Sequence, residues 1–226
     1  MSKETPTLLA FDTAMMGASV AIFHEGRIYS ETDETVGTQA ANLVPMIESV
    51  LHQAGIWYEQ IDRLITTIGP GSFTGIRIGL ATAQGILAAQ PMEVSTLTTL
   101  QALAYHAQQI KFDGNLWACI NAGKGELVAQ MFHVKQSEVA PINAPALFKP
   151  HDFQSQLQTN NYMANDTVAG NGVAMLSNLQ NVPTIDAIIL PQAAQFIHAT
   201  LNTSDVSALI PYYVRPPDAK MSVIKT

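Results

Sequence analysis

Apolar and polar positions along the first part of the chain change their period near Gly37. Before this point the apolar positions form three short runs typical of strands, and a glycine turn predicts a hairpin between the second and the third. The runs cover residues 7–12, 19–23 and 27–32. After Gly37, apolar side chains recur at helical spacing, which places them on one face of a helix that ends at Gly55. These side chains are Leu43, Met46, Ile47, Val50, Leu51 and Ala54.

A second alternation of strand and helix follows directly. Residues 64–68 form a short apolar run, and a helix is expected from about residue 73 to about residue 89. Residues 92–95 predict a further strand, after which Ser95 or Thr96 would cap a third helix. The resulting order of three strands, helix, strand and helix fits the repeated unit of the actin-like and sugar-kinase-like fold.

The second half of the chain repeats the opening pattern. Strands are expected over residues 116–121 and 126–134 with a glycine turn between them. A Phe-His pair follows Asn121 at the same offset at which another follows Asp12. We therefore predict two related α/β lobes, the second smaller than the first. They span residues 1–110 and 111–226, and the tail after Pro216 is expected to be mobile.

The most specific motif is GPGSFTGIRIG, which lies between a predicted strand and a predicted helix. A glycine-rich turn before a helix can present backbone N–H groups to a phosphate. The motif lacks the Lys of the P-loop and the spacing of the dinucleotide fingerprint, so a structural turn is favoured over anion binding, which stays open. The turn residues of interest are Gly69, Pro70, Gly71, Ser72, Phe73, Thr74 and Arg77.

The helix after this turn is apolar on every side, and Arg77 is its only charge. Such a helix must be buried on every side, so one face is expected on its own sheet and another on more protein. Gly75, Gly79 and Ala83 form a row of small residues that would let a second helix approach closely. The preceding helix carries only Glu48, so the two helices predict a subunit interface; cover by the C-terminal half of the chain is the alternative. The predicted interface residues are Leu43, Met46, Ile47, Val50, Gly75, Ile76, Gly79, Leu80, Ala83 and Ile86.

Composition narrows the classes of partner. Charged residues make up 13% of the chain, against about 25% in an average soluble domain. The net charge of -7 and the lack of a Lys/Arg cluster argue against autonomous binding of nucleic acid. The single Cys119 lies in an apolar run and is expected to be a buried, inert thiol. No segment resembles a signal peptide or a bilayer-spanning helix, so a cytoplasmic protein is expected.

The sequence contains few residue patterns typical of a catalytic site or a metal site. The histidines are scattered without ligand spacing, so no metal site is predicted. Ser72 follows a glycine, but GPGSF is not the nucleophile elbow G-x-S-x-G. Asp12 and Thr13 could be a vestigial nucleotide site, and Gly170 and Gly172 a relic of an adenosine loop. A standalone actin-like ATPase or peptidase is therefore the alternative function.

Several segments together resemble the bacterial TsaB family, the glycoprotease-like paralogues of TsaD. They are FDTA, ASVAIF, NLVPMI, GPGSFTGIRIGLATAQGI, VSTL and YYVR. The resemblance covers most of residues 7–135 and implies an α/β actin-like (ASKHA, ribonuclease H-like) fold of two lobes with a reduced second lobe. It also implies a non-catalytic role in making N6-threonylcarbamoyladenosine at position 37 of tRNAs that read ANN codons.

The same resemblance implies the partners and cofactors. The chain would form a heterodimer with the metal-bearing transferase TsaD through the two apolar helices, and the ATPase TsaE would dock on the pair. No cofactor is expected on this chain alone, whereas ATP and a metal ion are expected in the partner subunits. Contact with tRNA would be made only through the complex, with no role for a membrane. Self-association of a chain without its partner is a further alternative.

The chain departs from the family pattern at two places. Gln39 stands where a His is common, and Asn121-Ala122-Gly123 stands where many relatives carry a D-A-R turn.

Overall fold

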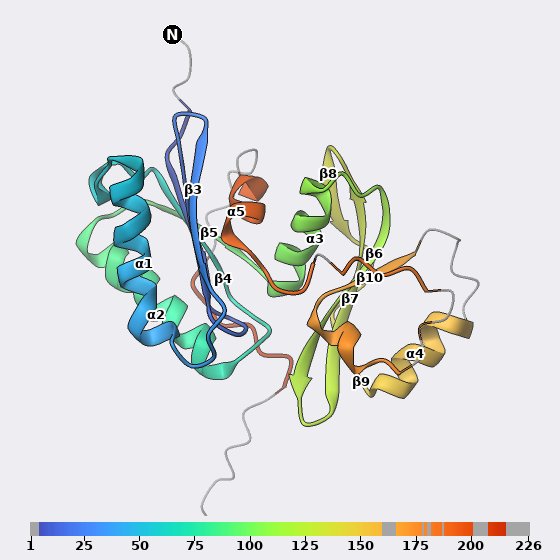
Figure 1. Ribbon diagram of the computed structural model, residues 1–226. Helices are drawn as coiled ribbons and strands as arrows, with labels where there is room; N and C mark the ends of the chain where they lie inside the picture. The colour runs from blue at the N-terminus through green and yellow to red at the C-terminus, as the bar shows by residue number, and fades with distance from the viewer. Residues whose placement is uncertain are drawn as a thin grey trace, which may run out of the picture.

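The computed structural model is organised around two sheets, with helices outside and between them (Figure 1). The residues that it describes are 5–159, 166–177, 179, 182–186, 188–200 and 208–215. Two helices from distant parts of the sequence, α3 (Thr99–Gln109) and α5 (Ala193–Phe196), lie between the sheets (Figure 1). Each sheet therefore forms its own lobe, and the lobes meet at these two helices.

The first sheet has the strand order β3-β2-β1-β4-β5. Its strands are β1 (Leu8–Asp12), β2 (Ala18–His24), β3 (Arg27–Asp33), β4 (Arg63–Thr67) and β5 (Glu93–Leu97). The first three strands form an antiparallel meander, whereas β1, β4 and β5 run parallel. Parallel neighbours need crossover connections, and the crossover helices are α1 (Gln39–Ala54) and α2 (Phe73–Ala89). The predicted meander and both predicted helices are confirmed.

The ends of α1 and α2 follow from local sequence chemistry. Gly55 ends α1 with a left-handed φ of 70°, a conformation that costs glycine little. Ser72 caps α2, because its hydroxyl accepts a hydrogen bond from the Gly75 N–H at 3.2 Å. A short 3₁₀ helix, η1 (Tyr58–Gln60), lies between α1 and β4.

The predicted start of the third helix is wrong. β5 continues to Leu97, so Ser95 and Thr96 belong to the strand rather than to a cap. The cap of α3 is Thr98, which exchanges hydrogen bonds with Gln101 in a capping box. The sequence T-L-T-T offers several capping residues in a row, and strand pairing decides which of them is used.

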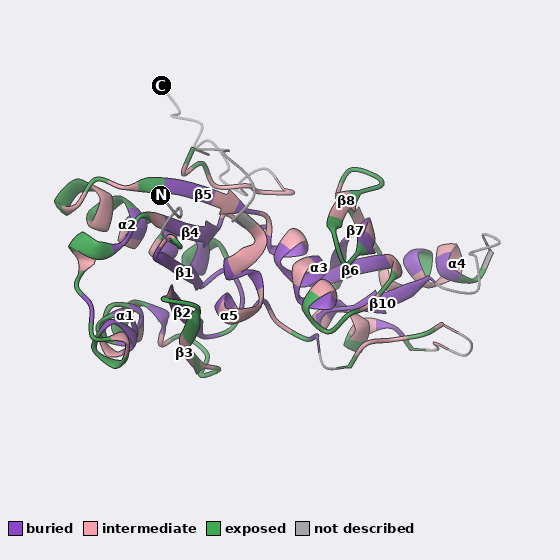
Figure 2. Ribbon diagram, turned by 90° about the horizontal axis from the view of Figure 1, so that it is seen from above, coloured by how far each residue is buried: buried purple, intermediate pink, exposed green. Residues whose placement is uncertain are grey.

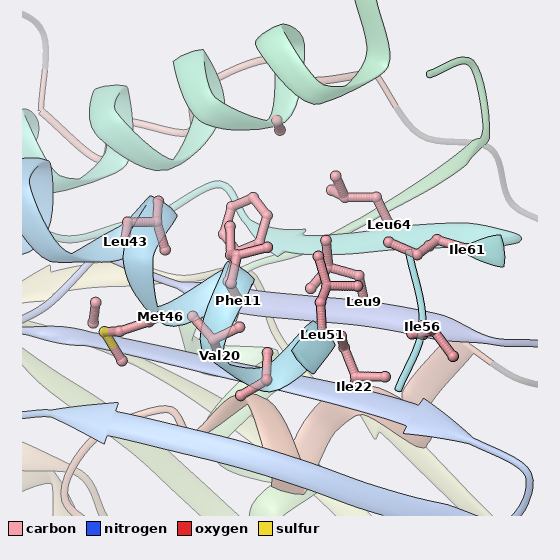
Figure 3. Close-up of a cluster of buried hydrophobic side chains, with 14 of the residues drawn as sticks. Leu9, Phe11, Val20, Ile22, Leu43, Met46, Leu51, Ile56, Ile61 and Leu64 are labelled. Atoms are coloured by element: carbon pink, nitrogen blue, oxygen red, sulfur yellow. The ribbon is translucent and has the colours of Figure 1, made fainter. Parts of the chain in front are cut away.

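The two faces of the first sheet are covered by different parts of the chain. α1 and α2 cover one face, where apolar side chains of α1 point at those of β1, β2 and β4 (Figure 3). Labelled members of this cluster are Leu9, Phe11, Val20, Ile22, Leu43, Met46, Leu51 and Leu64. The opposite face packs against α5 and the 3₁₀ helix η3 (Ile197–Thr200), with Phe196 and Ile197 fully buried against Leu8, Ala10 and Ile65.

The second sheet repeats the first with fewer strands. Its order is β10-β6-β7-β8, and β9 also pairs with β7. The strands are β6 (Gly114–Gly123), β7 (Glu126–Lys135), β8 (Glu138–Pro141), β9 (Ala146–Phe148) and β10 (Thr167–Ala169). As in the first sheet, three successive antiparallel strands are followed by a parallel one, reached through α4 (Pro150–Thr159). In the place that β5 takes beside β4, Thr184 makes only a single parallel bridge to Val168 of β10. The predicted actin-like fold with a reduced second lobe is confirmed.

Each lobe also contains segments from the sequence range of the other lobe. The strands of the first sheet lie before residue 110 and those of the second sheet lie after it. However, α5 and η3 return from the second range to cover the first sheet. The side chain of Met15, from the first range, packs into the core of the second sheet. The predicted mobile tail after Pro216 lies outside the described residues.

Candidate functional site

The glycine-rich turn of residues 69–72 is pinned against the loop that follows β1. Its Ser72 N–H donates to the Ala14 carbonyl at 2.7 Å, and a Cβ on Gly71 would lie 2.1 Å from the same oxygen. Gly69 adopts a φ of +103° and precedes Pro70 through a cis peptide bond. Because Ser72 donates to Ala14 and accepts from Gly75, the structure gives the turn an internal role and supports the structural interpretation over anion binding.

The row of small residues on α2 faces the chain's own first lobe. A Cβ on Gly75 would lie 2.0 Å from the Thr13 carbonyl oxygen, and one on Gly79 would lie 2.5 Å from the Thr13 hydroxyl. That hydroxyl donates to the Gly75 carbonyl at 2.8 Å. The glycines therefore let α2 approach the end of β1, which corrects the prediction that they admit a partner helix.

The same correction applies to most of the predicted interface residues. Those on α1 lie in the core beneath the helix, and those on α2 other than Ile86 are buried too. The buried set is Leu43, Met46, Ile47, Val50, Gly75, Ile76, Gly79, Leu80 and Ala83. Only Ile86 stays half-buried, packed at the edge of the core. The apolar pattern thus shows which side chains share a face, but this face belongs to the chain's own sheet.

A different set of residues forms the outer side of the two helices, which we call the α1–α2 outer face. Figure 2 shows the outer turns of both helices largely exposed or intermediate, whereas the central strands β1 and β4 of the sheet are buried. The exposed residues of α1 are Ala40, Ala41, Val44, Pro45, Glu48, His52 and Gln53, and those of α2 are Phe73, Thr74, Arg77, Ala81, Gln84, Gly85, Ala88 and Ala89. The face therefore carries one carboxylate, one guanidinium and one imidazole, and its remaining side chains are small, apolar or amide.

At the start of α2 this face ends in an aromatic cluster. The Arg77 guanidinium lies 3.6 Å from the centre of the Phe73 ring, and Phe73 is 46% exposed. The Tyr213 ring packs against Phe73 with a centroid separation of 5.3 Å, and the Arg77 Nε donates to the Tyr213 hydroxyl at 3.4 Å. Tyr213 belongs to the YYVR segment, so residues far apart in sequence meet here. Neither helical periodicity nor local turn chemistry could have predicted this contact.

Asp12 lies at the carboxyl end of β1, and its side chain is only 4% exposed. Its Oδ1 accepts hydrogen bonds from the Thr67 hydroxyl and from the Ala14 N–H at 3.3 Å. Burial raises the pKa of this carboxyl to about 6, although both hydrogen bonds oppose the rise. Asp12 also lines a small hollow, of about 10 Å³, together with Ser19, Thr32, Glu34 and others.

The surroundings of Asp12 limit what it can bind. Thr13, the second predicted nucleotide residue, is buried and bonded to α2. Met15, two residues further on, is 7% exposed because its side chain fills space in the core of the second lobe. The Gln39 side-chain amide donates to the Met15 carbonyl at 3.1 Å and so ties the loop to α1. The loop after β1 is thus held by the protein itself on three sides.

The equivalent loop of the second lobe is closed in a similar way. The Asn121 side-chain oxygen accepts from the Gly123 N–H at 2.8 Å, and the Asn121 N–H donates to the Asn171 side chain at 2.9 Å. A Cβ on Gly170 would lie 2.1 Å from the Cys119 carbonyl oxygen, and one on Gly172 would lie 3.0 Å from the Cys119 sulfur. These glycines let the 3₁₀ helix η2 (Asn171–Met175) pack on β6, which is a structural reason for the AGNG sequence.

Other candidate chemistry is limited as well. In the part of the chain that the structure describes, no group of three His, Cys, Asp or Glu side chains could hold a metal ion. Cys119 is fully buried, as predicted, and burial raises the pKa of its thiol to about 12. None of the described helices combines the length and apolarity needed to cross a membrane.

Comparison with known proteins adds a family match. A family model described as "TsaD: tRNA N6-adenosine threonylcarbamoyltransferase" matches residues 37–220. Curated relatives include the protein "tRNA threonylcarbamoyladenosine biosynthesis protein TsaB" of Haemophilus influenzae, 34% identical over 54% of this chain and 51% of that protein. The protein of the same name from Bacillus subtilis is 22% identical over 97% of this chain and 99% of that protein.

The chain spans about half the length of several of the curated relatives that it matches, among them the Haemophilus influenzae protein at 51% and the Escherichia coli protein at 52%. A solved structure named "YeaZ from Pseudomonas aeruginosa" is 26% identical and superposes with a TM-score of 0.80 over 92% of this chain and 99% of that one. The fold is thus shared over nearly the whole of both chains.

Proposed function

Because the chain belongs to the TsaD family, and within it to the TsaB group, we propose that it is a non-catalytic scaffold subunit in the biosynthesis of N6-threonylcarbamoyladenosine on tRNA. In this role it pairs with TsaD and holds that transferase in a competent geometry. The pair acts at position 37 of tRNAs that read ANN codons, in the cytoplasm. The observation that carries the proposal is the exposed and nearly uncharged α1–α2 outer face.

The composition of this face supports a protein partner. Surface helices usually carry charged residues on the side away from the core, and these two carry only Glu48 and Arg77 there. Ala81, Gly85 and Ala88 leave room for another helix to lie close against α2. Val44, 44% exposed, adds an apolar side chain on α1. Interfaces are depleted of charge at their centre, so the face suits docking better than open solvent.

The loop beside Asp12 supports the absence of catalysis by this chain. A metal–nucleotide site needs a carboxylate that a ligand can reach, whereas Asp12 is only 4% exposed and Thr13 is hydrogen-bonded to α2 within the fold. Met15 occupies space between the lobes. In this proposal ATP and the metal ion therefore belong to the partner subunits, TsaE docks on the pair, and tRNA is contacted through the complex.

The experiment compares arginine substitutions on and off the proposed face. Ala81→Arg and Val44→Arg place a long cation at exposed positions of α2 and α1, so the isolated chain should keep its fold. Gln109→Arg, at an exposed position of α3, is the matched control. We expect the first two variants to raise the dissociation constant for TsaD by about tenfold or more, since each would desolvate an unpaired charge. Unchanged affinity of both variants in sedimentation velocity would reject the interface.

Two alternatives make different predictions for the isolated chain. A standalone ATPase would bind Mg-ATP in calorimetry and release phosphate without TsaD, which would overturn the scaffold role. Self-association through the same face would give a dimer in light scattering that Ala81→Arg dissociates. Addition of TsaD should then replace that dimer by the heterodimer, because both would use one surface.

A further inference from the structure

Residues 208–215, which we call the C-terminal strap, run across both lobes after the chain has returned to the first sheet. The strap has no regular secondary structure, yet it is anchored at each end. At its first-lobe end the Tyr212 N–H donates to the Ile68 carbonyl at 2.8 Å. Leu209 packs beneath α2 with Ile76 and Leu80. The strap therefore lies along the strand-to-helix turn that opens α2.

Gly69 shows how closely the strap approaches this turn. A Cβ on Gly69 would lie 2.6 Å from the Tyr212 carbonyl oxygen, so only a glycine leaves room for the strap at this point. The next residue, Tyr213, stacks on Phe73 and receives the Arg77 hydrogen bond. Tyr213 thus contacts both members of the exposed Phe73–Arg77 pair and packs against one side of it.

The other end of the strap is held by the second lobe. Val214 packs at the edge of the core that contains Met15 and α3. The Arg215 guanidinium forms an ion pair with Glu126 at the start of β7 and donates to the Gly123 carbonyl at 3.3 Å. Glu126 also pairs with Lys149 at 3.0 Å, and hydrogen bonds to these two cations lower the pKa of its carboxyl. One residue separates Tyr213 from Arg215, a reach of about 7 Å in an extended chain.

We propose that the C-terminal strap is a positioning device, in which Tyr213 holds Phe73 and Arg77 at the start of α2 and Arg215 makes that position depend on the second lobe. Phe73 and Arg77 are exposed, so without the contact to Tyr213 their side chains would sample more conformations. Because Arg215 binds the β6–β7 turn, a displacement of this turn moves Arg215. Only Val214 separates Arg215 from Tyr213, so Tyr213 moves as well. The inference rests on contacts within one chain and stands whether or not the α1–α2 outer face binds TsaD.

Hydrogen exchange of the isolated chain, followed by mass spectrometry, tests the device. Arg215→Ala should speed exchange about fivefold in peptides covering residues 208–215 and 69–77, with the strands unchanged. Lys149→Ala is the matched control, because it removes the other cation on Glu126 without touching the strap. The charge-swapped pair Glu126→Arg with Arg215→Glu should restore protection, which a purely local packing role of Arg215 would not predict.

A second variant separates positioning from folding. Tyr213→Leu removes the aromatic contact and keeps an apolar side chain, so it should speed exchange at residues 69–77 and leave the β6–β7 turn protected. Faster exchange confined to residues 208–215 in Arg215→Ala would show a passive tail and overturn the proposal. So would unchanged exchange everywhere, or a loss of protection throughout the chain that the charge swap does not restore.

Discussion

Asp12 and Asp33 show how one residue type acquires opposite behaviour in one small domain. Asp12 is buried at the end of β1, and burial raises the pKa of its carboxyl to about 6. Asp33 lies at the end of β3 and accepts hydrogen bonds from the Thr38 hydroxyl, the Thr35 N–H and the Asn42 amide, which lower the pKa of its carboxyl well below the usual range. The sequence marks Asp12 as a candidate ligand, but only the structure shows that folding works against its charge.

These environments predict opposite effects of the same substitution. The folded chain binds the Asp12 proton more tightly than the unfolded chain, so this residue favours folding below pH about 4, and its contribution is lost as the pH rises through about 6. Asp12→Asn keeps an acceptor for the Thr67 hydroxyl and should raise the free energy of unfolding by about 1–3 kcal/mol at pH 7 to 8. The gain should vanish below pH 4.

Asp33→Asn is the control with the reverse sign. Its carboxylate is stabilised by the fold, so the substitution should lower stability at neutral pH, and the loss should shrink as the pH falls below the ordinary range of Asp. Urea unfolding of both variants between pH 3 and pH 8 gives the two curves. Parallel curves for Asp12→Asn and the parent chain would contradict the raised pKa of Asp12.

At the scale of elements, sequence periodicity predicts which residues share a face but not what that face meets. The helical period correctly groups Leu43, Met46 and Val50 on α1, and Gly55 correctly marks the end of this helix. The partner of each face depends on the tertiary arrangement, so the apolar face assigned to another subunit is the one on the chain's own sheet. The exposed side had no positive signal in the sequence beyond its lack of charge.

Two glycines on α2 test this assignment of faces. Gly75→Ala would place a Cβ 2.0 Å from the Thr13 carbonyl oxygen, and backbone at the end of β1 would have to move. Gly85→Ala meets nothing within 4 Å, because Gly85 lies on the outer side. We expect Gly85→Ala to stabilise the chain by about 0.5–1 kcal/mol through helix propensity and Gly75→Ala to destabilise it by more than that gain. Equal stabilisation in urea titrations would place Gly75 away from Thr13.

At the scale of the whole molecule, the repeat of two lobes could be read from the sequence, whereas their connection could not. The Phe-His pairs after Asp12 and Asn121 mark equivalent hairpins, β1–β2 and β6–β7. The return of α5 to the first sheet and of the C-terminal strap to α2 depends on contacts between distant residues, which leave no period in the sequence. Met15 is the clearest case, since its neighbours in sequence belong to one lobe and its neighbours in space to the other.

Met15 should therefore make the two lobes unfold together. Its side chain is 7% exposed and packs with Leu103 and Ile120 in the second core. Met15→Ala should lower stability by about 2–5 kcal/mol and also separate the unfolding of the lobes. Met46→Ala is the matched control, because Met46 is 3% exposed and packs within the first core alone. Its loss should lower stability, but both lobes should still unfold in a single transition.

The buried Trp117 of β6 provides the probe for the second lobe, since fluorescence follows its exposure. Hydrogen exchange of β1, β2 and β4 follows the first lobe in the same urea series. In the parent chain and in Met46→Ala the two midpoints should coincide, whereas in Met15→Ala they should move apart. Coincident midpoints in all three chains would mean that α3, α5 and the strap couple the lobes without Met15, and that the methionine only fills space.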